Sequence, residues 1–136
     1  MVCVFDACAL IAYLHNEPGS DTINDLLKKA IDSEIEIYMN IINLIEVHYA
    51  NIRILGKDQA SIILEKILAS PIQVVSVISD QIFHEASRLK SVYKISLGDC
   101  IGLATAFEFS GQFVTSDHHE LDAVAEDEPS LIFWFR

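Results

Sequence analysis

Apolar positions along the chain fall into two kinds of segment, short runs typical of buried strands and longer stretches with helical spacing. The short runs predict five strands, at residues 2–5, 35–39, 72–77, 112–115 and 131–135. The longer stretches predict seven helices, at residues 7–14, 20–30, 40–54, 58–69, 80–92, 97–109 and 118–124. Strands that alternate with helices favour a mainly parallel sheet with helices on both faces. The expected fold class is therefore α/β, a three-layer α/β/α sandwich.

Turn residues separate these elements without forming a linker. Pro18-Gly19 and Ser70-Pro71 end two of the predicted helices, and no internal repeat is found. A chain of 136 residues with 51% hydrophobic residues fits one domain with its own core, spanning residues 1–136. No apolar run approaches the ~18 residues of a membrane span, so a soluble protein without a membrane partner is expected.

The remaining composition bears on the compartment and on the partners. The N-terminal segment has no basic region and carries Asp6 within an apolar stretch, which argues against a signal peptide. Cys3, Cys8 and Cys100 follow no metal-ligand spacing and fit reduced thiols, so a cytoplasmic location is expected. With 9 basic and 20 acidic side chains, the formal net charge is −11. Such a charge argues against a protein that binds nucleic acid through a broad basic face.

Four acidic residues interrupt otherwise apolar sequence, and they are Asp6, Glu46, Asp99 and Asp117. A buried carboxylate is costly unless a charged or hydrogen-bonding partner compensates it. Asp6 and Asp117 directly follow predicted strands, and ligands of open α/β sheets bind beyond the carboxyl ends of the strands. Glu46 and Asp99 lie in the first turns of predicted helices that can reach the same edge. The four carboxylates are therefore expected to converge on one site.

Converging carboxylates repel one another, so a divalent cation is the natural partner of such a site. Oxygen ligands without a cysteine–histidine cluster favour Mg²⁺ or Mn²⁺ over Zn²⁺. These ions activate water, hold a phosphate group and stabilise a leaving oxygen. The acids therefore indicate hydrolysis of a phosphoryl ester.

At these acids the sequence resembles the PIN-domain nucleases, and in particular the VapC-like toxins of type II toxin–antitoxin pairs. The resemblance covers nearly the whole chain and rests on four segments, V-F-D-A-C-A-L-I-A-Y-L, N-L-I-E-V, I-S-L-G-D-C-I-G-L-A-T-A and V-T-S-D-H-H-E-L. It implies a central parallel sheet and a Mg²⁺- or Mn²⁺-dependent endoribonuclease that acts on single-stranded or structured RNA. It also implies a homodimer and an antitoxin protein as partner.

Carried over position by position, Asp6, Glu46, Asp99 and Asp117 match the catalytic acids of the family. The resemblance makes Asp6 and Asp99 the principal metal ligands. Glu46 and Asp117 complete the site, or hold waters and a second ion. Whether one or two ions bind stays open.

Four further residues near these acids are assigned by the resemblance. Thr115 and Ser116 match a polar pair that supports the cluster by hydrogen bonds. Glu120 is either a peripheral ligand or a solvated helix position. Cys8 stands where the family often has Ser or Asn, so the supporting hydrogen bond made there is in question.

Basic residues close to the predicted site are candidates for RNA contacts. Lys90 and Lys94 are expected to share a helix face, and Arg53 lies near the end of another helix. Solvated surface charge explains these three residues equally well.

Two other classes of protein compete with an active nuclease. The same fold without catalysis would be a protein-interaction module with a vestigial acidic site, and Cys8 is its only support in the sequence. A receiver-like phosphoacceptor domain also gathers Asp residues around Mg²⁺. That domain needs adjacent acids after the first strand and a Lys near the end of the chain, and both are missing. The sequence therefore favours a metal-dependent endoribonuclease.

Overall fold

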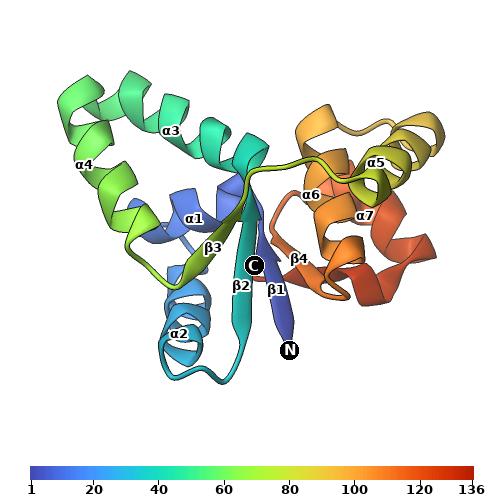
Figure 1. Ribbon diagram of the computed structural model, residues 1–136, viewed down its shortest axis with the longest axis horizontal. Coiled ribbons are helices and arrows are strands. Elements are labelled where there is room, and N and C mark those ends of the chain that lie inside the picture. The colour runs from blue at the N-terminus through green and yellow to red at the C-terminus, as the bar shows by residue number, and fades with distance from the viewer.

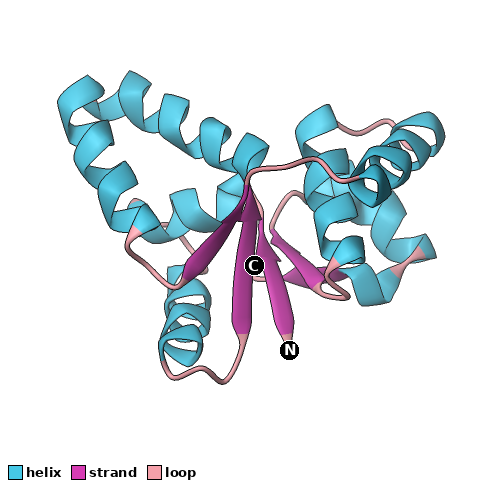
Figure 2. Ribbon diagram, in the orientation of Figure 1, coloured by secondary structure: helices cyan, strands magenta, loops and turns pink.

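The computed structural model describes residues 1–136, which form a five-stranded parallel sheet between two groups of helices (Figure 1, Figure 2). The strands are β1 (Val2–Phe5), β2 (Glu36–Asn40), β3 (Ile72–Val75), β4 (Gln112–Thr115) and β5 (Ile132–Trp134). The helices are α1 (Ala7–Leu14), α2 (Ser20–Ile31), α3 (Ile41–Leu55), α4 (Lys57–Leu68), α5 (Asp80–Val92), α6 (Leu97–Glu108) and α7 (His118–Asp127), with a short 3-10 helix at Pro129–Leu131. The strand order is β3-β2-β1-β4-β5.

β1 occupies the centre of the sheet and pairs with β2 on one side and β4 on the other. Phe5 is opposite Val114 in the register with β4, so the two strands end within one residue of each other. The backbone N–H of Asp6 extends this pairing by donating to the Val114 carbonyl across 3.1 Å. The residues that follow β1 and β4 are therefore neighbours at the carboxyl edge of the sheet.

Side chains of the central strands alternate between two apolar cores, one on each face of the sheet. Cys3 and Phe5 point into the core formed with α1, α2, α3 and α4, whereas Val4 points into the core formed with α5, α6 and α7. In β4, Val114 and Phe113 divide between the two cores in the same way. Figure 1 shows the two groups of helices on opposite sides of the sheet, which confirms the predicted α/β/α sandwich.

α6 lies directly on the sheet because a glycine faces it. A Cβ at Gly102 would lie 2.3 Å from the ring of Phe113, so only hydrogen fits between the helix and β4 at this point. The close packing brings the N-terminal turn of α6, which contains Asp99, toward the carboxyl edge of the sheet.

Several element boundaries differ from the sequence prediction. β3 ends at Val75, two residues early, because its partner β2 ends at Asn40, which caps α3. Val77 is consequently 70% exposed instead of being paired in the sheet. α7 continues to Asp127, and Pro129 then starts the 3-10 helix that precedes a shorter β5.

α3 and α4 form a helical arm that extends away from the sheet (Figure 1). Gly56 is the only residue between the two helices and has a φ of 85°, a conformation that favours glycine. The arm carries large apolar side chains that are at least 46% exposed, and they include Ile45, Ile54, Ile62 and Leu68. No helix of the chain has the length and apolar character to span a bilayer.

Candidate active site

Asp6 is the first residue after β1, and its carboxylate is held by protein donors. Oδ1 accepts the N–H of Ala7 across 2.7 Å and so caps α1. Oδ2 accepts the hydroxyl of Thr115 at 2.8 Å and the thiol of Cys8 at 3.0 Å. Burial raises the pKa of Asp6, and these hydrogen bonds oppose the rise because they favour the charged form. The carboxylate is therefore fixed in one orientation.

Cys8 stands where the family often has Ser or Asn, and its side chain still donates a hydrogen bond to Asp6. Its thiol donates to Asp6, and its sulfur accepts the N–H of Ser116 at 3.4 Å and the Ser116 hydroxyl at 3.6 Å. Burial first, and the nearby Asp6 carboxylate second, raise the pKa of the Cys8 thiol to about 12. The thiol is consequently protonated at neutral pH and able to donate. Cys8 thus joins the start of α1 to the segment that follows β4.

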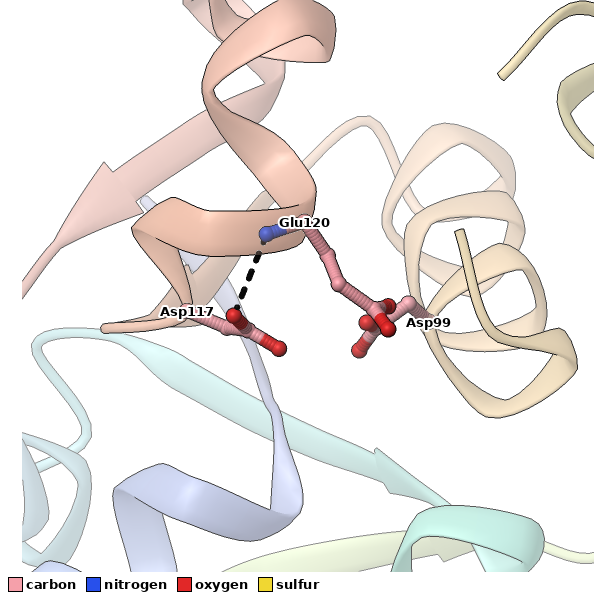
Figure 3. Close-up of side chains that lie close together, drawn as sticks. All are labelled: Asp99, Asp117 and Glu120. Atoms are coloured by element: carbon pink, nitrogen blue, oxygen red, sulfur yellow. Dashed lines mark hydrogen bonds between the residues drawn. The ribbon is translucent and has the colours of Figure 1, made fainter. Parts of the chain in front are cut away.

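Thr115 and Asp117 connect the end of β4 to the start of α7. The hydroxyl of Thr115, which is fully buried, donates to Asp6 and accepts the N–H of Asp117 across 3.1 Å. Asp117 caps α7, since its Oδ1 accepts the N–H of Glu120 at 3.2 Å (Figure 3). The other carboxylate oxygen of Asp117 accepts no hydrogen bond from the chain and is available to a ligand.

Asp99 and Glu120 face each other from α6 and α7 (Figure 3). Ser96 caps α6 by accepting the N–H of Asp99 at 3.2 Å, and its own N–H donates to Glu120 Oε2 at 2.9 Å. One carboxylate oxygen each from Asp99, Asp117 and Glu120 lie within 4.8 Å of one another. The spacing allows one ion to contact all three groups.

The protonation of Asp99 and that of Glu120 are linked. Burial raises the pKa of Asp99 well above its usual range, and the hydrogen bond with Glu120 raises it further. The same hydrogen bond, with that from the Ser96 N–H, lowers the pKa of Glu120. Without a cation, a proton on Asp99 therefore reduces the repulsion within the cluster. A divalent cation at this point would displace that proton.

Glu46 approaches the same site from α3. The amide of Asn43 donates to Glu46 Oε1 at 3.0 Å and to the carbonyl of Gly98 at 3.1 Å, which ties α3 to α6. A Cβ at Gly98 would lie 2.8 Å from Glu46 Oε1, so the Glu46 carboxylate rests directly on the backbone of α6. Burial raises the pKa of Glu46, and the bond from Asn43 opposes this.

All four acids singled out in the sequence line one cavity of about 250 Å³, together with Glu120. Its walls include Cys8, Ser96 and Tyr49, and no Lys or Arg lines it. Five carboxylates with no Lys or Arg among the lining residues form an all-oxygen donor set. Such a set fits a hard divalent cation, since hard cations prefer oxygen ligands and offset the repulsion between the acids.

Lys90 and Lys94 do not share a helix face, contrary to the sequence expectation. α5 ends at Val92 because the backbone becomes extended at Tyr93, with φ −113° and ψ 150°. Lys94 therefore lies in the connection to α6. The ammonium of Lys90 donates to the carbonyl of Ile95 across 2.5 Å and so stabilises this connection.

Arg53 lies on α3, and its guanidinium carbon is 5.0 Å from the centroid of the Tyr49 ring. Tyr49 itself lines the acidic cavity although the sequence analysis did not single it out. The only sequence signal is its spacing, because a residue three positions after Glu46 lies on the same face of a helix. Arg53 follows Tyr49 by four positions and continues that face.

A parallel α/β/α sandwich with acidic side chains gathered beyond its central strands defines the class of this protein. The sequence model of the PIN domain family matches residues 3–127, so the chain belongs to the PIN domain family. No curated protein matches the sequence.

Solved structures share the fold at low sequence identity. VapBC2 from Rickettsia felis, bound to a DNA fragment from its promoter, superposes with a TM-score of 0.78 at 16% identity over 98% of both chains. The DNA-bound VapBC from Salmonella typhimurium has a TM-score of 0.74 at 11% identity, over 100% of this chain and 99% of that chain. VapC20 from Mycobacterium tuberculosis, a sarcin-ricin loop cleaving toxin, has a TM-score of 0.63 at 13% identity, over 81% and 85% of the two chains.

Proposed function

We propose that this PIN-domain protein is a Mg²⁺- or Mn²⁺-dependent endoribonuclease and the toxin of a toxin–antitoxin pair. The observation that carries the proposal is the meeting of five carboxylates in one cavity without a Lys or Arg. A phosphodiester is negatively charged and is repelled from such a cavity unless a cation is bound there. RNA binding therefore depends on the metal, and the metal-free protein binds RNA hardly at all.

The residues divide into distinct roles in this proposal. Asp99, Asp117 and Glu120 hold the ion, since their carboxylate oxygens lie within 4.8 Å of one another. Asp6, which lines the same cavity, completes the ligand set. When bound, the ion activates water and offsets the charge on the scissile phosphate. Glu46, which lines the same cavity and whose pKa is raised by burial, accepts a proton from the attacking water. Hydrolysis leaves a 5′-phosphate and a 3′-hydroxyl.

RNA as the substrate is supported by family membership and by one structural relative. VapC20 is a sarcin-ricin loop cleaving toxin, and it shares the fold of this chain. We place the present protein in the same reaction class, acting on single-stranded or structured RNA.

Two kinds of observation support an antitoxin partner, the structural relatives and the surface of this molecule. The solved VapBC structures are complexes, and FitAcB from Neisseria gonorrhoeae also shares the fold, with a TM-score of 0.67 at 18% identity. Residues 117–128 contain six acids and no Lys or Arg, so this segment attracts a basic partner segment. The exposed apolar side chains of the α3–α4 arm offer further surface that a bound protein would cover.

Self-association and a cytoplasmic location complete the proposal. A groove of about 430 Å³ between α5 and α6 is lined mainly by apolar side chains, among which Phe83 is 60% and Leu97 59% exposed. We propose that this groove contributes to a homodimer. The three cysteines are free thiols, which fits the reducing conditions of the cytoplasm.

RNA cleavage in the presence of Mn²⁺ tests the enzymatic proposal. We expect chelation of the metal to abolish cleavage, and Asp6→Asn and Asp99→Asn each to reduce it by about 100-fold or more. Glu34→Gln, which removes an exposed acid outside the cavity, serves as the control and should cleave normally. Cleavage that persists with chelator, or in both cavity variants, would overturn the mechanism.

A non-catalytic interaction module is the competing function, and its sequence support was Cys8. The thiol of Cys8 still donates to Asp6, so the substitution does not remove the hydrogen bond on which the acid depends. This contact supports the active enzyme over the module.

A further inference from the structure

One aromatic side chain stands in the wall of the acidic cavity. Glu46, Tyr49 and Ala50 of α3 all line the cavity, because positions three and four apart share a helix face. Tyr49 is 45% exposed, so much of its ring is open to solvent beside the five carboxylates. It contributes little to either apolar core, and neither core contains it.

Tyr49 also borders a second, apolar hollow on the α3–α4 arm. This hollow has a volume of about 220 Å³, and its other lining residues are Ile41, Leu44, Ile45, His48 and Leu64. Tyr49 therefore lines both a cavity suited to a metal and a phosphate and a second hollow whose walls are mainly apolar. A nucleotide combines the same two parts, a charged phosphate and a base with apolar faces.

Arg53 adds the positive charge that the acidic cavity lacks. Its guanidinium lies 5.0 Å from the centroid of the Tyr49 ring. The arginine–carboxylate ion pairs of the chain involve Arg88 and Arg136 and leave Arg53 without a carboxylate partner. Because Arg53 is also exposed, its donors are free to bind a phosphate of a strand that passes over Tyr49.

We infer that Tyr49 and Arg53 form a nucleotide-binding subsite for the RNA substrate, beside the acids that act on the phosphodiester. One base stacks on the face of the Tyr49 ring opposite Arg53, and an adjacent phosphate pairs with Arg53. The inference rests on the proposed ribonuclease function and adds a preference for an unpaired nucleotide, because a base within a duplex cannot stack on a side chain. It also explains how a chain with a net charge of −11 retains RNA near its active site.

The test measures binding of a fluorescein-labelled single-stranded oligoribonucleotide in the presence of Mn²⁺, together with its cleavage. Tyr49→Leu should weaken binding by about 5- to 150-fold, the range for loss of one base–aromatic stack, while Tyr49→Phe binds as the natural chain does. Tyr13→Leu is the matched control, since Tyr13 is a 38% exposed tyrosine that lines a different hollow. Thermal melting of the Tyr49 variants should match that of the natural chain.

Two further measurements separate stacking from charge. Replacing single nucleotides by abasic ones should weaken binding to the natural chain at one position, and the same replacement should have no effect on Tyr49→Leu. Arg53→Gln should reduce the slope of log affinity against log salt by about 0.7, the value for one phosphate contact of a single strand. Tyr49→Leu should leave this slope unchanged, as should Lys28→Gln, which removes an exposed charge on α2.

Failure of the subsite and failure of the proposed function give different results. Normal cleavage with equal RNA affinity in all Tyr49 variants would overturn the inferred subsite and would leave the proposed ribonuclease function supported. RNA binding that depends on Tyr49 but never leads to cleavage would support the subsite and overturn the proposed activity. If Tyr49→Leu weakens binding of a co-purified protein partner and not of RNA, the surface belongs to that partner and the inference is wrong.

Discussion

The thiol of Cys8 donates to Oδ2 of Asp6 across 3.0 Å, so a cysteine helps to orient the most buried acid of the site. A hydroxyl or an amide at this position would donate more strongly than a thiol, which is a weak donor. The chain compensates by aiming the hydroxyl of Thr115 at the same oxygen, at 2.8 Å.

Replacement of Cys8 tests this relationship. Cys8→Ala leaves Asp6 with one donor fewer on Oδ2, and we expect cleavage to fall by about 10-fold, the equivalent of one modest hydrogen bond. Cys8→Ser restores a donor of similar size and should retain activity. The Mn²⁺ concentration for half-maximal cleavage should rise in Cys8→Ala, because a mobile carboxylate binds the ion less well. Equal activity in all three proteins would show that the donors from Thr115 and Ala7 orient Asp6 without Cys8.

Gly98 is predicted to be required for activity and not for folding. A Cβ at this position would lie 2.8 Å from Glu46 Oε1 and would displace that carboxylate. A displacement of about 1 Å costs on the order of 100-fold in rate, so Gly98→Ala should lose cleavage to that extent. Its thermal stability should not fall, because alanine is a better helix former than glycine.

Gly56→Ala provides the contrasting control. Gly56 has a φ of 85° and no atom within 4 Å of an added Cβ, so only backbone strain results. We expect a loss of about 1–3 kcal/mol in the free energy of unfolding, since φ 85° with ψ 165° is a region that only glycine adopts readily, and normal cleavage at permissive temperature. If Gly98→Ala cleaves normally as well, Glu46 is not held in place by the contact with α6.

The sheet, the helices and the four acids were predictable because each has a local signal. β-branched runs and helical spacing mark the elements, and an acid that follows a buried strand directly, such as Asp6, marks the carboxyl edge. The predicted ends of elements were wrong where pairing with another strand sets the end. β3, for example, ends at Val75 because its partner strand β2 ends there.

The remaining parts of the site depend on contacts between elements far apart in the chain. Asn43 reaches Glu46 and the carbonyl of Gly98, and the second contact exists only because α3 crosses α6. The sequence does not decide whether Glu120 is a ligand or a solvated residue. The orientation of its side chain depends on a hydrogen bond from the N–H of Ser96, 24 residues earlier. Local periodicity carries no information on such long-range pairs.

Trp134 is predicted to report the protonation of His118. The two rings are stacked, with centroids 3.8 Å apart, and Trp134 is the only tryptophan of the chain. Hydrogen bonds to the Arg136 carbonyl and to Asp122 raise the pKa of His118 above its ordinary value of 6.5. Because a protonated imidazole quenches indole emission, tryptophan fluorescence should increase with pH through a midpoint above 6.5. Asp122→Asn should lower this midpoint, and His119→Ala should leave it unchanged; a midpoint below 6.5 in the natural chain would contradict the assignment.

The stability of the metal-free protein is predicted to fall as the pH rises from about 4 to about 9. Burial and Glu120 raise the pKa of Asp99 from 3.8 to about 9, so the folded state binds a proton that the unfolded state releases. The stabilisation is complete below the unfolded pKa of Asp99 and is lost as the pH approaches the folded value. The lowered pKa of Glu120 acts in the opposite direction, but only below about pH 4.5, so it does not affect the range from pH 5 to pH 9.

Thermal melting between pH 5 and pH 9 measures this dependence, with and without Mn²⁺. Mn²⁺ should raise the melting temperature most at high pH, where the ion no longer competes with the proton on Asp99. Asp99→Asn isolates the group, because it removes the titrating carboxyl and keeps its size. We expect this variant to be more stable than the natural chain at pH 8 without metal, to show a flatter pH profile, and to gain little from Mn²⁺. A natural chain whose metal-free stability stays level from pH 5 to pH 9 would mean that Asp99 is ionised in the folded state and that the cluster tolerates its own charge without a cation.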